Sequence, residues 1–200
     1  MSAKVYTKQM SHEEAMSDLR HALQAMTEET DGVRHPELLR ELSREHPNTI
    51  KIIESLHPLR RYTCFVHAFG FTERPQYVLI AQIGFNYVYA SPEFAHWLFD
   101  QGHLSEITES DLVPGDLAFY SSTDGRFRHA AIFFGSDRFQ SKWGLGYLFE
   151  HRLFEVPDSY GNSARFFRGL SYAQAIRSFV CYADSKGMHF RKRSLCEDSQ

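Results

Sequence analysis

Residues 113–143 read VPGDLAFYSSTDGRFRHAAIFFGSDRFQSKW, and the rest of the chain is interpreted from this stretch. Short apolar runs alternate here with turn residues, among them Asp124-Gly125 and Ser136-Asp137. Such runs are typical of antiparallel strands joined by tight turns. The same pattern continues beyond Trp143, with a turn over residues 144–146. We therefore expect five strands, at about 116–121, 129–134, 138–143, 148–156 and 164–168.

Helical patterns precede and follow these strands. The first 60 residues predict two helices: one starts at a capping box over residues 11–14, and the second begins near Pro36. The second helix is interrupted at Pro47 and includes Ile50–Ile53 on its apolar side. We interpret residues 1–59 as a helical extension or cap. Three roles stay open for it: it completes the core, it inhibits the protein as a prodomain, or it binds a partner.

A helical half followed by strands indicates an α+β fold with an antiparallel sheet of about five or six strands. Further helices are expected at 64–70, 92–101 and 171–185. The main domain is predicted over residues 60–185. Residues 186–200 form a polar tail that contains Arg191-Lys192-Arg193.

The composition excludes several classes of protein. With 42% hydrophobic residues the 200-residue chain can bury a core, and its net charge of −3 argues against a nucleic-acid partner. No apolar run approaches the roughly 20 residues that span a bilayer, and no secretion signal precedes the charged N-terminal segment. We expect synthesis in the cytoplasm, with signal-independent export left open. No CxxC or HExxH motif indicates a metal, and no cofactor is expected.

The chain has three cysteines. A number that is small and odd argues against a disulfide framework. Cys64 stands at the start of a short apolar helix, with Thr63 before the first turn. The N-terminus of a helix favours a thiolate, which is the nucleophilic form. His129 opens a strand and is of the residue type that takes a proton from a thiol. Cys181 and Cys196 fit inert positions.

These motifs resemble the NlpC-type superfamily of papain-like cysteine peptidases, over about residues 60–145. That superfamily has a cysteine at a helix start, a Pro-Gly-Asp strand start and a His-led strand ending in glycine. Cys64, Pro114–Leu117 and His129–Gly135 stand in those places. The chain departs from the pattern around Cys64, where Asp-Cys-Ser-Gly is usual, and after His129. The Ser141-Lys142-Trp143-Gly144 run, with His151, Val156-Pro157 and Tyr160-Gly161 after it, resembles a less characterised bacterial branch.

The resemblance implies a papain-like fold and a third polar residue that orients the histidine. Gln140 is the first choice for this residue, with Ser141, Lys142 and His151 as rivals. The implied activity is hydrolysis of a peptide-type amide through a Cys64 thioester, with a peptide or peptidoglycan fragment as substrate. Two alternatives stay open. One is an acyltransferase, thioesterase or deamidase effector on the same fold. The other is a non-catalytic binding protein.

Overall fold

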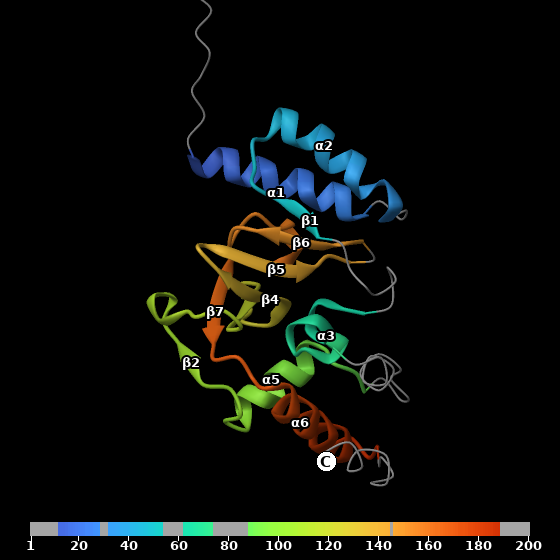
Figure 1. Cartoon of the computed structure of the whole chain (residues 1–200), viewed down its shortest axis with the longest axis vertical. Helices are drawn as coiled ribbons and strands as arrows, with labels where there is room; N and C mark the ends of the chain where they lie inside the picture. The colour runs from blue at the N-terminus through green and yellow to red at the C-terminus, as the bar shows by residue number, and fades with distance from the viewer. Residues whose placement is uncertain (1–11, 29–31, 54–61, 74–87, 145, 189–200) are drawn as a thin grey trace, which may run out of the picture.

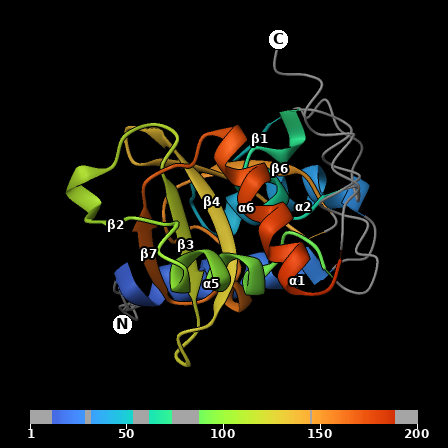
Figure 2. The same cartoon turned by 90° about the horizontal axis from the view of Figure 1, so that it is seen from below.

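The structure is a computed structural model that describes residues 12–28, 32–53, 62–73, 88–144 and 146–188. A single antiparallel sheet lies between two groups of helices (Figures 1 and 2). The helices α1 (His12–Glu28) and α2 (His35–Glu45) cover one face. The helices α3 (Cys64–Ala68), α5 (Pro92–Asp100) and α6 (Tyr172–Ser185) cover the other. The α+β class is therefore confirmed.

The described part of the sheet has seven strands in the order β1-β6-β5-β4-β3-β7-β2. Their bounds are β1 Lys51–Ile53, β2 Glu106–Ile107, β3 Leu117–Ser121, β4 Phe127–Gly135, β5 Arg138–Lys142, β6 Leu148–His151 and β7 Ser163–Phe167. All five predicted strands are present, although β6 ends five residues earlier than expected. The expected total of five or six strands is too low, because β1 and β2 were not predicted.

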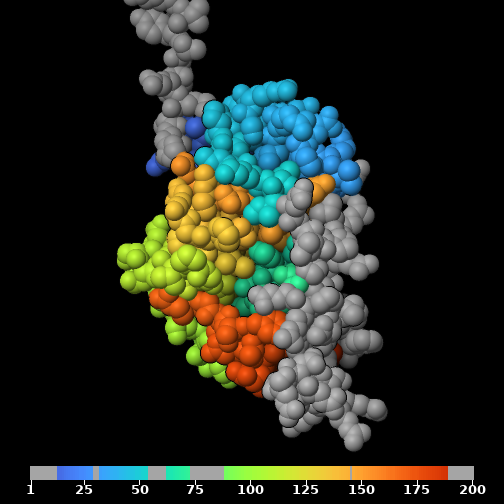
Figure 3. Space-filling model, viewed as in Figure 1, coloured from blue at the N-terminus to red at the C-terminus, as the bar shows by residue number. Residues whose placement is uncertain are grey.

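The strand β1 corrects the prediction of a helix that includes Ile50–Ile53. Ile52 lies opposite Phe149 of β6, so these residues form an edge strand. Two hydrogen bonds hold the preceding turn, since the Glu155 carboxylate accepts from the N–H and the hydroxyl of Thr49, at 2.9 and 2.5 Å. The segment before residue 54 therefore contributes to the sheet itself. In Figure 3 the blue and cyan atoms of residues 12–53 form one end of the molecule.

Each face of the sheet has its own apolar core. Leu19 and Leu23 of α1 pack on one face with Ala118, Tyr120 and other side chains that point the same way from their strands. The opposite core joins the three remaining helices to the alternate strand positions. Because side chains alternate along a strand, the core to which a residue belongs shows which face it occupies.

The Pro-Gly-Asp start of β3 is built as the sequence predicts. Asp116 is 1% exposed and accepts hydrogen bonds from the N–H groups of Val113 (2.8 Å) and Gly169 (2.9 Å). Arg168 Nη1 donates a third, at 2.7 Å. These bonds fix the start of β3 against the residues that follow β7. Asp116 therefore has a structural role, as expected.

The 3₁₀ turns between these elements are η1 Gly32–Arg34, η2 Phe71–Glu73, η4 Glu109–Asp111 and η5 Asp158–Tyr160. The turn η5 lies against α1 and β4. Within the described ranges, no helix combines the length and the apolarity needed to cross a bilayer. The stretch Gln76–Tyr89, to which the sequence assigned no element, lies largely outside the described residues, as do Cys196 and most of the polar tail.

Candidate active site

Cys64 is the first residue of α3, as the sequence predicts. Thr63 caps the helix: its hydroxyl accepts a hydrogen bond from the N–H of Val66 (3.3 Å) and donates one to the carbonyl of Ala90 (3.3 Å). Phe65 and Val66 point into the core beneath, which fixes the helix on β4 and β5. The thiol is thus held at the end of a short, well-anchored helix.

Three backbone N–H groups surround the Cys64 sulfur. They belong to Cys64 itself, to Phe65 and to Ala130, and each lowers the pKa of the thiol, as does the charge of Lys142. Cys64 is partly exposed, but desolvation of its sulfur acts in the other direction and is the largest effect, so the pKa of Cys64 is raised to about 11 from an ordinary 9.0. The sequence suggested a thiolate at this helix start. The structure indicates a resting thiol instead, because desolvation outweighs the local N–H dipoles.

His129 lies in β4, opposite Tyr120, and its side chain is 1% exposed. Its ring stacks on the ring of Tyr160, with centroids 3.8 Å apart and planes 12° from parallel. Its Nε2 atom has no hydrogen-bond partner among the described residues. Burial, and then the nearby His151 and His67, hold the pKa of His129 well below its ordinary value. The imidazole is therefore neutral at pH 7.

Cys64 approaches β4 at the residue after His129, although the side chain of His129 points to the opposite face of the sheet. The thiol lies at the N–H of Ala130, the residue that follows His129. The ring of Tyr160 stacks on His129, and burial, then the charge of Cys64, raises the pKa of its hydroxyl. In the described structure no hydrogen bond joins Cys64 directly to His129. Both residues are neutral in the resting state.

Gln140 does not lie beside His129. It pairs with Ile132 in the β4–β5 register, and Ile132 packs on the face that α3 covers. His129 instead shares the opposite face with Tyr120. The alternation of side chains along β4 therefore separates the two residues, and the structure gives no support to Gln140 as the orienting residue.

The rivals of Gln140 divide between the two faces. Ser141 and His151 lie on the His129 face and form a closed network. Trp143 Nε1 donates to Ser141 Oγ (2.8 Å), the Ser141 hydroxyl bonds His151 Nε2 (2.7 Å), and His151 Nδ1 bonds the carbonyl of Arg152 (2.7 Å). Burial lowers the pKa of His151 to about 4. Because both ring nitrogens of His151 are hydrogen-bonded to other groups, His151 affects His129 only electrostatically.

Tyr160 is the site residue to which the sequence assigned no role. Its hydroxyl accepts a hydrogen bond from the N–H of Gly144, at 3.1 Å, which joins η5 to the turn after β5. The only sequence signal was that the Tyr160-Gly161 pair belongs to the pattern of the less characterised branch. Trp143 is fully buried, and its ring stacks on that of Phe149 with centroids 4.1 Å apart.

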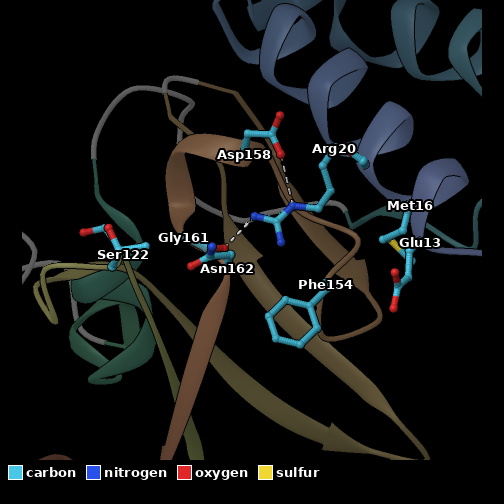
Figure 4. Close-up of a pocket in the computed structure, with 10 residues that line it drawn as sticks. Glu13, Met16, Arg20, Ser122, Phe154, Asp158, Gly161 and Asn162 are labelled. Carbon is cyan, nitrogen blue, oxygen red and sulfur yellow. Dashed lines mark hydrogen bonds and ion pairs between the residues drawn. The ribbon is translucent and has the colours of Figure 1, made fainter.

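A groove of about 610 Å³ lies between α1 and the turn η5 (Figure 4). Arg20 lines it, with its guanidinium held by Asp158 (3.3 Å) and by the carbonyl of Gly161 (2.5 Å). Phe154 forms the apolar wall. Neither Cys64 nor His129 lines this groove. Because Asp158 already compensates its charge, Arg20 serves to fasten α1 onto η5.

Within the part of the chain that the structure describes, no group of three or more His, Cys, Asp or Glu side chains is arranged to hold a metal ion. No protein-family model matches the chain, and searches of curated proteins and of solved structures found no match either. Any assignment of function therefore depends on the geometry of the residues themselves.

Proposed function

We propose that the protein is a cysteine hydrolase that cleaves a peptide-type amide, with Cys64 as nucleophile and His129 as proton acceptor. One observation supports this most directly. The Cys64 sulfur lies among three backbone N–H groups, one of which belongs to the residue after a buried, neutral His129. A thiol, N–H donors for negative charge and a neutral imidazole are the groups that acyl transfer requires.

The reaction starts from the neutral pair. As the Cys64 sulfur attacks the substrate carbonyl, the thiol proton moves to the His129 imidazole and the carbonyl oxygen gains negative charge. The N–H groups of Cys64 and Phe65 face this charge, and the loss of one such donor costs roughly 3 kcal/mol of transition-state stabilisation. His129 then gives its proton to the leaving amine. Water hydrolyses the resulting thioester and restores the thiol.

The resemblance to NlpC-type peptidases supports a peptide from the bacterial cell wall as the first substrate to test. A second candidate function has its own supporting observation. The high pKa of Cys64 is typical of a structural cysteine, which favours a non-catalytic protein built on the same fold. The two functions differ in whether Cys64 forms an acyl intermediate.

The test is a screen of amide and thioester substrates that starts with peptidoglycan stem peptides. Released amine or thiol is measured, and hydroxylamine traps the acyl group as a hydroxamate. We expect turnover that is lost in Cys64→Ala and reduced at least a hundredfold in His129→Ala. Cys181→Ser is the matched control, because Cys181 is exposed on α6, and it should retain activity. Turnover that survives in Cys64→Ala would refute the proposal.

A further inference from the structure

Lys142 is buried in an unusual setting. It is the last residue of β5 and only 1% exposed. Its Nζ donates a hydrogen bond to the carbonyl of Gly144 (3.0 Å) and lies 5.3 Å from the centre of the Tyr62 ring. Both contacts suit a cation, since a carbonyl oxygen and an aromatic face are electron-rich. The side chain is therefore held in one position as an ammonium.

No Asp or Glu among the described residues forms an ion pair with Lys142. A lysine is almost never fully buried unless it is paired with an opposite charge. An ammonium has three hydrogens to donate, and Gly144 accepts one. Among the described residues, this buried positive charge thus has no permanent negative partner. Such an arrangement is more common at functional sites than elsewhere.

The thiol of Cys64 is the acidic group that faces Lys142. Lys142 projects from the face of β5 that α3 covers, and Tyr62, which its ammonium contacts, lies two residues before Cys64. The charges of Cys64 and Lys142 act on each other in both directions. The other titratable groups described here are Tyr62 before α3, His67 within α3 and Tyr160 on η5, and none of them is a carboxylate.

We propose that Lys142 supplies the positive charge that balances the negative sulfur of Cys64 during the reaction. The inference rests on the proposed function, because it assigns a partner to the same nucleophile. The thiol proton passes to His129 while the carbon–sulfur bond forms, and Lys142 keeps all of its protons throughout. Lys142 thus acts through Cys64 as an electrostatic partner and neither accepts nor donates a proton.

The charge state of Lys142 agrees with this role. Burial lowers its pKa to about 8, so most molecules carry the ammonium at pH 7. Above pH 8 the ammonium loses its proton and the sulfur loses its partner. Activity should therefore fall on the alkaline side. An arginine in the same place would stay charged at that pH.

The test compares Lys142→Met, which keeps the length without the charge, with Lys142→Arg and with wild type. Lys51→Met is the matched control, because Lys51 is an exposed lysine on the neighbouring edge of the sheet. Cys64 alkylation by iodoacetamide and substrate turnover are measured from pH 5 to 10, with circular dichroism as the check on folding.

We expect Lys142→Met to slow Cys64 alkylation at pH 7 at least tenfold and to move its pH profile to higher pH. Lys142→Arg should restore the rate and abolish the loss of turnover above pH 8. A folded Lys142→Met protein with the wild-type alkylation profile would overturn the proposal. If Lys142→Met does not fold, the test depends on Lys142→Arg. A loss of turnover above pH 8 that is the same in Lys142→Arg as in wild type would overturn the proposal. Failure of the proposed function can be told apart from failure of the Lys142 proposal, because in that case the Cys64→Ala variant would turn over substrate as fast as wild type.

Discussion

The resting state of Cys64 predicts a particular pH dependence for its reaction with iodoacetamide. The perturbation is a change from pH 7 to pH 10 in the native protein. With a pKa of about 11, only about one thiol in a thousand is ionised at pH 8, against about one in ten for the ordinary value of 9.0. Cys64 should therefore react about a hundredfold more slowly than an ordinary thiol at pH 8. Between pH 7 and pH 10 its rate should rise roughly a thousandfold.

The assay is quenched alkylation followed by mass spectrometry of the peptide that contains Cys64. Cys181, which is exposed on α6, reacts in the same sample and reports on the reagent. Near-ultraviolet circular dichroism at each pH checks that the protein stays folded. A rate that reaches a plateau below pH 8 would refute the reasoning, because it would mean a preformed thiolate–imidazolium pair. In that case burial would not be the dominant effect on the thiol.

Three further predictions concern the polar groups that hold the site in place. Glu155→Ala leaves the Thr49 N–H without its acceptor. We therefore expect the free energy of unfolding, measured in urea, to fall by about 3 kcal/mol. The control variant Glu150→Ala should lose much less. Ser141→Ala removes one partner from each of two buried groups, His151 Nε2 and the indole N–H of Trp143. It should cost about 2 kcal/mol, and an unchanged urea midpoint would contradict the network. Stability should also fall as pH drops from 6.5 to 4. The folded pKa of His151 is about 4 against an ordinary 6.5, so the unfolded chain binds the extra proton. About 3 kcal/mol should be lost across that window, and His151→Gln should weaken the loss.

Much of the fold could be predicted from local sequence. Turn residues at Asp124-Gly125 and Ser136-Asp137 separated the strands correctly, since Ser136 and Asp137 both adopt the positive φ angles that a tight turn needs. The helices expected at 92–101 and 171–185 are present as α5 and α6, and their side-chain caps Ser91 and Ser171 explain where they begin. These signals work because a few adjacent residues determine the conformation.

The errors came from interactions between distant parts of the chain. Ile50–Ile53 have an apolar pattern that suits a helix, but β6 offers an unpaired edge, and pairing with that edge decides the outcome. Counting along the chain from His129 puts Gln140 on the next strand, but it does not show which face of the sheet its side chain occupies. Its face depends on its register with Ile132, which no local signal gives.

The site itself was predicted only in part. The sequence correctly placed Cys64 at the start of a helix, with Thr63 before its first turn, and His129 in a strand. It did not reveal the burial that keeps the thiol protonated, nor the stacking of Tyr160 on His129. Both depend on how η5 and the strands close over the site, and this is a property of the folded protein.

The place of β1 in the sheet limits how this protein can be regulated. A chain cut after Ile53 would lose the neighbour of β6 and expose the backbone N–H and C=O groups of that strand. It would also uncover the apolar face that α1 and α2 protect. Strands of other protein molecules can pair with such an exposed edge and cover the apolar face beside it. Proteolysis at this point would therefore yield aggregates rather than an activated protein, and any control exerted through the N-terminal helices has to leave them attached.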